Sequence, residues 1–374
     1  MFELVEGSDP KKISGVVSRG PEGLIFNFDA DVIRNIDGLP FPEREKFWGL
    51  TEEEKLTVDV SYICSIRGCP YRCYYCASPA HWKRDKTQYR SPSSLVSEMR
   101  YVKEKYWNRK RDYDYSASAN AKSKNELIIE DNSAVYFVDD IFTVHPQRIK
   151  EILRLMIDQN LGMKWKCEAR TDHLDEEICQ LMAKAGCIRV KLGFESGSDR
   201  ILKRMNRTYS RDHFIELAHR IRKILPGEGI STDIIVGFPG ETEFEFSDTL
   251  TVMEEVKFDS AFNFKYSPRP GTKASEYDDP IPEDIKQQRL EQIIALQKRH
   301  TLERNLDLVG TIQGVLIEKE SKMSSHQWAG RTDSNKWVIF DKEDVQIKDM
   351  VSIQIKKAKG ITLHGEVLKQ AEAA

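Results

Sequence analysis

Long apolar runs are missing from this sequence, and their absence excludes one class of protein. The 374 residues contain no stretch of about 18 apolar residues, so we expect no helix that crosses a membrane. The N-terminus, MFELVEGSDPKK, has no basic stretch followed by an apolar core, so we expect no secretory signal. An excess of positive charge is missing too. The net charge of −3 gives no general attraction to nucleic acid, so RNA binding would need a local patch.

Cysteine is absent from residues 1–63, and four cysteines then crowd into residues 64–76. The total of seven is odd, which argues against a disulfide framework and for metal or redox chemistry in a reducing compartment, the cytoplasm. The eight histidines show no HxxxH or HExxH spacing, so we assign none of them to a metal. Cys167, Cys179 and Cys187 each lie alone in an apolar pattern, which predicts core positions.

Short β-rich runs alternate with amphipathic segments from about residue 58 to residue 266. The expected strands are 58–64, 134–140, 163–169, 188–194, 230–238 and 260–267. The expected helices include 91–106, 146–160, 175–186 and 211–225, and a long helix follows at 283–310. This alternation predicts an α/β fold, a partial (β/α)6-type barrel with helices outside a parallel sheet.

The two ends of the chain differ in character from this barrel. Residues 1–57 predict a lead-in hairpin around a Gly-Pro-Glu-Gly turn, followed by a linker. Within the barrel region, 58–307, the polar segment at about 107–133 predicts a mobile surface insertion. Residues 308–374 contain short strands with turn signals, which predict a small all-β barrel.

The strongest motif is Cys69-x3-Cys73-x2-Cys76, directly after the first expected strand. Barrel active sites gather at this carboxyl face, and one such loop can wrap three thiolates around a [4Fe–4S] cube. Three ligands leave one iron open for a cofactor or substrate. The alternative is a structural zinc knuckle with Cys64 as the fourth ligand, although zinc knuckles usually come as two separated CxxC pairs.

This loop, with Tyr75 before the last cysteine, resembles the cluster loop of the radical S-adenosylmethionine (SAM) superfamily. The segments GFESGS (193–198), MNR (205–207), TDIIVGFPGET (232–242) and YSPRPGT (266–272) are similar to tRNA methylthiotransferases (MiaB-like). GRT and NK in the C-terminal region resemble the RNA-binding TRAM barrel of those enzymes. By contrast, RGCPYRCYYCASPAHW and AVYFVDDIFTV look more like the cobalamin-binding branch of the superfamily.

The resemblance implies one [4Fe–4S] cluster on Cys69, Cys73 and Cys76, with SAM as second cofactor. The residues expected to bind SAM are Tyr75, Asp139, Asp140, Glu195, Ser196, Arg207, Gly237 and Pro239. Several also have plainer explanations. Ser196 could serve helix entry, the acidic pair could start a turn, and Gly237 and Pro239 could simply form one. Arg170 could face the cavity or form a surface ion pair. No catalytic residue is assigned.

We therefore expect a radical SAM transferase that modifies RNA, with tRNA as the expected substrate, by methylthio or methyl transfer. RNA would bind the C-terminal module, whose cations and aromatics suit phosphates and stacked bases: Trp328, Arg331, Lys336, Trp337, Lys356, Lys357 and Lys359. An electron donor such as flavodoxin or ferredoxin is also implied. One alternative is an enzyme of the cobalamin-binding branch acting on a small molecule or peptide. The other is a non-enzymatic zinc and RNA-binding protein.

A further expectation concerns the N-terminal region. Methylthiotransferases carry an N-terminal domain whose three cysteines hold a second cluster, and the cysteine-free residues 1–63 resemble neither it nor a cobalamin domain. The lead-in instead looks like the tail that follows such a domain. We therefore predict a single cluster in this chain, with a partner that supplies the missing domain or a simpler radical reaction.

Overall fold

The computed structural model describes residues 7–27, 33, 35–44, 60–78, 87–107, 134–225, 229–332, 334–347 and 349–368. The insertion predicted at 107–133 lies outside these residues except for Trp107. The chain divides into two units, Met1–Pro40 and Phe41–Ala374, and each is described by itself. The domain boundaries expected at 57/58 and 307/308 remain predictions. Among the described residues, no helix combines the length and the apolar character needed to cross a membrane.

The first unit contains a small antiparallel hairpin. Strands β1 (Val17–Gly20) and β2 (Gly23–Phe26) pair directly, with Gly20 opposite Gly23. The turn between them reaches Gly23 at a φ of 129°, a conformation that glycine adopts without a steric penalty. Two 3-10 turns, η1 (Pro10–Lys12) and η2 (Ile36–Gly38), flank the hairpin in sequence.

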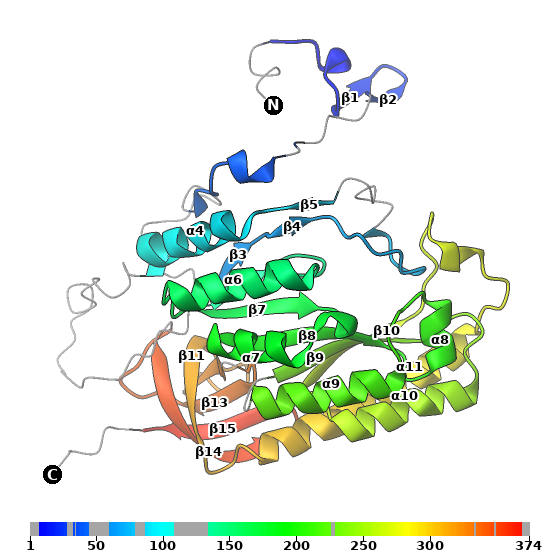
Figure 1. Ribbon diagram of the computed structural model, residues 1–374. Helices are drawn as coiled ribbons and strands as arrows, with labels where there is room; N and C mark the ends of the chain where they lie inside the picture. Colours follow the sequence, from blue (N-terminus) through cyan, green and yellow to red (C-terminus); the bar gives the residue numbers. More distant parts are fainter. Residues whose placement is uncertain are drawn as a thin grey trace. The chain divides into compact units, whose positions relative to one another are not determined.

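The second unit is built on a six-stranded sheet in which every neighbouring pair is parallel (Figure 1). Its order is β10-β9-β8-β7-β6-β3. The strands are β3 (Val60–Ile63), β6 (Ala134–Phe137), β7 (Lys164–Ala169), β8 (Cys187–Glu195), β9 (Gly229–Val236) and β10 (Ser260–Lys265). Each lies within or overlaps an expected strand, so the partial (β/α)6 barrel is confirmed. Strands β4 (Ile66–Arg67) and β5 (Gln88–Tyr89) form a separate antiparallel ribbon.

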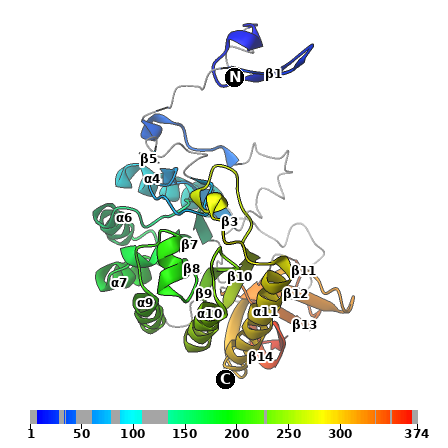
Figure 2. The same ribbon diagram turned by 90° about the vertical axis from the view of Figure 1, so that its right-hand side faces the viewer.

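Helices cover the outer face of this sheet (Figure 2). The longer helices there are α4 (Pro92–Val102), α6 (Pro146–Asp158), α7 (Glu176–Lys184), α9 (Arg211–Ile224), α10 (Glu243–Val256) and α11 (Glu283–Leu306). This unit also contains the shorter helices α8 (Asp199–Arg204), η5 (Lys103–Trp107), η7 (Thr171–His173) and η8 (Lys273–Glu276). The apolar stripe predicted for α6 is buried as its helical spacing requires. Helix α10 lies between two of the expected strands, where the alternation predicts a helix, and Thr242 and Glu245 form a capping box at its start.

Five strands close a small barrel at the C-terminus in the order β11-β12-β13-β15-β14. They are β11 (Ile312–Glu320), β12 (Gln327–Thr332), β13 (Trp337–Asp341), β14 (Met350–Lys359) and β15 (Thr362–Val367). The predicted all-β barrel is confirmed, and Gly330 lies within β12. That glycine is required, since a Cβ there would lie 2.3 Å from the carbonyl oxygen of Leu316.

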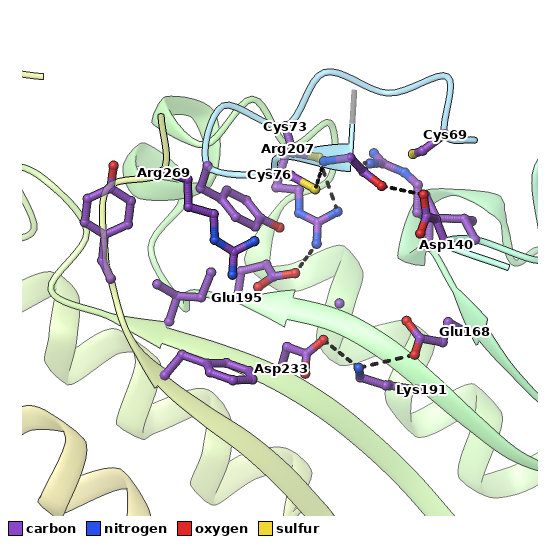
Figure 3. Close-up of a pocket in the computed structure, with 18 of the residues that line it drawn as sticks. Cys69, Cys73, Cys76, Asp140, Glu168, Lys191, Glu195, Arg207, Asp233 and Arg269 are labelled. Atoms are coloured by element: carbon purple, nitrogen blue, oxygen red, sulfur yellow. Dashed lines mark hydrogen bonds and ion pairs between the residues drawn. The ribbon is translucent and has the colours of Figure 1, made fainter. Parts of the chain in front are cut away.

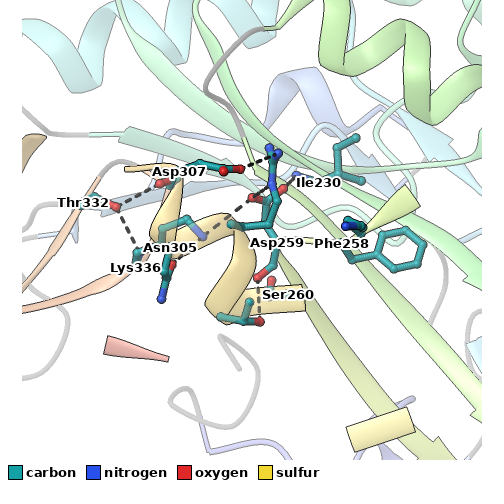
Figure 4. A network of polar contacts seen from close by, with 12 residues as sticks. Ile230, Phe258, Asp259, Ser260, Asn305, Asp307, Thr332 and Lys336 are labelled. Carbon is teal, nitrogen blue, oxygen red and sulfur yellow. Dashed lines mark hydrogen bonds and ion pairs between the residues drawn. The ribbon is translucent and has the colours of Figure 1, made fainter. Parts of the chain in front are cut away.

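A buried polar cluster joins the small barrel to the six-stranded sheet (Figure 4). Lys336 Nζ donates to Asn305 Oδ1 over 3.0 Å and lies 3.8 Å from Asp259 Oδ1. Asp259 Oδ2 accepts from the backbone N–H of Ile230 over 3.0 Å and from Arg222 over 3.2 Å. We call Asp259, Asn305 and Lys336 the junction hub. It lies at the amino ends of β9 and β10, the edge opposite to the one that receives the cysteine loop.

Candidate active site

The cysteine loop leaves β3 at the carboxyl edge of the sheet and is tied down by distant segments. The backbone N–H of Tyr74 donates to Met205 O over 3.0 Å, and Asn206 Nδ2 donates to Arg72 O over 2.6 Å. On its other side, the N–H of Ala274 donates to Tyr74 O over 2.9 Å. The MNR segment that resembles the family motif therefore positions the loop that carries the cysteines.

Cys69, Cys73 and Cys76 line one cavity of about 540 Å³, a size typical of ligand sites. All three are free thiols. Burial raises the pKa of Cys69 to about 11 and also raises that of Cys76. In the described part of the chain no three metal-binding side chains are gathered tightly enough to hold a metal as they stand.

The donor set nevertheless suits an iron–sulfur cluster. Arg170 Nη1 and Arg207 Nη1 each lie 3.8 Å from Cys73 Sγ, so two guanidinium groups donate toward this sulfur. The fourth cysteine of the zinc alternative is engaged elsewhere. The thiol of Cys64 donates to Ile66 O over 3.0 Å, and burial raises its pKa to about 12.

A buried ion pair between Glu195 and Arg207 forms the wall beside Cys73 (Figure 3). Their side chains are 6% and 7% exposed. A bulge between Gly193 and Glu195 turns the end of β8, and Glu195 takes a φ of 66°, a costly conformation for a residue other than glycine. Gly193 makes room for the pair, because a Cβ there would lie 2.4 Å from Arg207 Nη2. Burial raises the pKa of Glu195 against the opposing effect of Arg207.

The two aspartates that follow β6 have different positions. Asp139 is buried, and its carboxylate accepts from the N–H groups of Ser65 and Ile66 over 2.6 and 2.8 Å, so it fixes the start of the cysteine loop. Asp140 lines the cavity and accepts from Ser78 Oγ over 2.5 Å. Only the second member of the pair thus faces the space where SAM was expected.

Of the remaining residues expected to bind SAM, some line the cavity and others do not. Tyr75 lines the cavity, with its ring 5.8 Å from the guanidinium carbon of Arg207. Ser196 is fully buried, and its hydroxyl accepts from the N–H of Ser198 over 3.2 Å. Gly237 and Pro239 belong to the turn before α10 and are not among the cavity-lining residues. Their predicted contacts with SAM, like those of the other expected residues, stay predictions.

Sequence reasoning left Arg170 undecided and missed other charged residues of the cavity. Arg170 is 2% exposed, lines the cavity and donates to Asp172 and to Thr208 Oγ1, each over 2.8 Å. The missed residues are Glu168, Lys191, Asp233, Lys265 and Arg269. The available signal was charge inside a mostly apolar strand, as with the lysine of IRVKLGF and the aspartate of STDIIVGF.

Comparisons with known proteins identify the family of this chain. Residues 63–253 match the radical SAM superfamily, and residues 307–368 match the TRAM domain. The chain is 34% identical over 380 residues to the tRNA-2-methylthio-N(6)-dimethylallyladenosine synthase of Christiangramia forsetii, covering 98% of this chain and 74% of that protein. It is 35% identical over 372 residues to the synthase of the same name from Azobacteroides pseudotrichonymphae, covering 97% of this chain and 76% of that protein.

Two solved structures share the fold. The radical SAM methyltransferase TsrM from Kitasatospora setae gives a TM-score of 0.53 at 16% identity, covering 84% of this chain and 53% of that one. The cobalamin-dependent radical SAM enzyme OxsB gives 0.51 at 18% identity, covering 77% of this chain and 38% of that one. The first carries a bound cobalamin and a [4Fe–4S] cluster. The chain therefore belongs to the radical SAM superfamily and, within it, to the tRNA methylthiotransferases, which are transferases that use SAM and a [4Fe–4S] cluster.

Proposed function

We propose that this chain holds one [4Fe–4S] cluster on Cys69, Cys73 and Cys76 and modifies tRNA with SAM bound beside it. The main support is one cavity lined by three free cysteines and a buried Glu195–Arg207 pair. When bound, the cluster supplies the electron that cleaves SAM.

The chain's own residues would place SAM in this cavity. Arg207 presents a guanidinium that suits a carboxylate, and its Nε is buried with no partner among the described residues. Asp140 and Glu195 present carboxylates that suit the amino group of SAM.

The substrate assignment to tRNA follows the relatives and the C-terminal barrel. The relatives named above are synthases of a methylthiolated tRNA adenosine. On the barrel, Trp337 has Lys319 Nζ 4.4 Å and the guanidinium carbon of Arg331 4.2 Å from its ring centroid, a combination that suits RNA. Lys336, expected to contact RNA, is buried in the junction hub and serves the fold instead.

We propose methylthio or methyl transfer as the reaction, with reduction by a flavodoxin- or ferredoxin-type donor in the cytoplasm. The cysteines outside the loop do not offer a second cluster site, because Cys167, Cys179 and Cys187 are buried in the sheet and helix layers. Methylthiolation would therefore need a second cluster that these cysteines do not hold. Membership of the family excludes the non-enzymatic zinc protein.

Two measurements test this proposal. Anaerobic reconstitution should give a brown protein with about four irons per chain that forms 5′-deoxyadenosine from SAM and a reductant. Mass spectrometry of tRNA nucleosides, with and without the gene, should show one modified nucleoside lost in the deletion. A protein that cleaves SAM while the tRNA nucleosides stay unchanged would refute the tRNA assignment and favour a small-molecule or peptide substrate.

A further inference from the structure

Three charged side chains from adjacent strands meet on the concave face of the sheet, across the cavity from the cysteine loop (Figure 3). Lys191 of β8 lies between Glu168 of β7 and Asp233 of β9. Its Nζ is 3.4 Å from Glu168 Oε1 and 3.0 Å from Asp233 Oδ2. All three residues line the cavity that the cysteines also line. We call Glu168, Lys191 and Asp233 the cavity floor.

The cavity floor has hydrogen-bonding groups left over. Lys191 carries three N–H donors, and its two acidic neighbours engage two of them. The Oδ1 atom of Asp233 is buried and has no partner among the described residues. A buried acceptor without a partner is costly, and a ligand with a donor would satisfy it. The floor thus offers one free donor beside one free acceptor.

Exposed aromatic rings lie on the strand next to the cavity floor. Phe264 of β10 lines the same cavity although 49% of it is exposed, and it pairs in register with Ile235 of β9. Phe262 is 51% exposed, with Lys191 Nζ 5.0 Å from its ring centroid. Aromatic rings left open inside a cavity suit a flat partner that can stack on them.

We propose that the cavity floor and Phe264 bind the RNA base that is modified, an inference that rests on the function proposed above. Asp233 Oδ1 accepts the N–H of an exocyclic amino group, Lys191 donates to the neighbouring ring nitrogen, and the ring stacks on Phe264. This edge is that of adenine, including an adenine alkylated on its amino nitrogen, which keeps one N–H. The nucleotide enters unstacked, as bases that undergo chemistry do.

The division of the cavity supports a substrate site at the floor. Glu195 and Arg207, beside Cys73, already supply the opposite charges that suit the amino-acid end of SAM. Lys191 of the cavity floor lies on β8 four residues before Glu195. Among the described residues, the floor forms no ion pair with Glu195 or Arg207. A base held there faces the cofactor across the same cavity.

Binding to matched RNAs tests the proposal without turnover. The probes are a tRNA with unmodified adenosine at the target position and the same tRNA with purine riboside there, which lacks only the 6-amino group. The reconstituted protein should bind the purine riboside tRNA about tenfold more weakly, the usual cost of losing a good base contact. Asp233→Asn should bind the two RNAs equally well, whereas Lys191→Met should bind both more weakly and still discriminate between them, because purine riboside keeps the ring nitrogens. Lys184→Met, on exposed helix α7, should discriminate as the wild type does.

Each other outcome is decisive. Equal discrimination in the wild type and in Asp233→Asn, which is nearly isosteric, would overturn the base-binding role. So would a tenfold loss of SAM affinity in either variant, because the floor would then be part of the SAM site. A wild type that binds both RNAs equally overturns the cavity floor proposal alone. A wild type that binds neither RNA refutes the tRNA function, and the floor proposal with it.

Discussion

The junction hub and the active-site cavity are both buried clusters of charge, and they differ in how completely their groups are paired. In the hub, both carboxylate oxygens of Asp259 have partners, and Lys336 and Asn305 bond to each other. In the cavity, Arg207 Nε and Asp233 Oδ1 are buried without a partner among the described residues. Paired charged groups stabilise one arrangement of the fold, whereas unpaired polar atoms that face a cavity can bind a ligand. We therefore expect the chemistry at the carboxyl edge of the sheet, beside the cavity, and a structural role for the opposite edge.

Replacing the cluster cysteines should have the largest effect, and this effect should be confined to the active-site cavity. Replacing Cys69, Cys73 or Cys76 by alanine should remove the visible absorption of the cluster and abolish SAM cleavage, because three thiolates are the minimum that hold the cube. Cys64→Ala is the matched control, since its thiol bonds Ile66 O. Loss of iron in Cys64→Ala, with iron retained in one of the other three, would show that the ligand set is wrong.

Adding a single methyl group at Gly193 should weaken SAM binding without unfolding the protein. In Gly193→Ala the new Cβ meets Arg207 Nη2 at 2.4 Å, so the Glu195–Arg207 pair must shift. We expect SAM affinity to fall about tenfold while the cluster is retained. Gly229→Ala is the control, because a Cβ there meets nothing closer than 3.8 Å. Calorimetric titration of SAM would measure both, and an unchanged affinity in Gly193→Ala would remove this pair from the SAM site.

The hub should show the opposite response. Lys336→Met removes the buried donor to Asn305 Oδ1 and one of the cations near Asp259, whose Oδ1 also contacts Arg304 over 3.5 Å, so we expect a loss of about 1 to 3 kcal/mol in unfolding free energy. SAM affinity should stay unchanged. Lys356→Met removes a lysine whose side chain is 47% exposed and paired with Glu366, and should cost well under 1 kcal/mol. Equal losses in the two variants would contradict a structural hub.

The fold and the site differ in how much of each could be predicted from the sequence. The six strands followed from their apolar runs, and the cysteines from their spacing, because both depend on neighbours along the chain. The cavity floor did not, since Glu168, Lys191 and Asp233 come together only when β7, β8 and β9 pair in register. Lys336 was mistaken for an RNA contact because its exposure depends on how the small barrel meets the sheet. Contacts between elements were thus the part that local pattern could not predict.

The smallest expected effect depends on pH and lies at Glu245, outside both clusters. Burial alone would raise the pKa of Glu245, but hydrogen bonds from Arg200, Thr242 and Ser198 outweigh it and lower the pKa from 4.5 to about 2. Arg200 binds both carboxylate oxygens at 2.6 Å. A carboxyl group with a lowered pKa stabilises the fold fully above pH 4.5, and this contribution is lost as the pH falls toward 2.

Glu245→Gln keeps most of the helix cap but not the charge, so it should lose about 1 kcal/mol of unfolding free energy at pH 7. The variant and the wild type should then converge as the pH falls from 4.5 toward 2, because the wild-type carboxylate becomes protonated in that range. Glu243→Gln, two residues earlier with a side chain 74% exposed, is the matched control and should follow the wild type within about 0.5 kcal/mol. Urea unfolding at a series of pH values would measure this. A constant gap between Glu245→Gln and the wild type at every pH would mean that hydrogen-bond geometry, rather than charge, stabilises the start of α10.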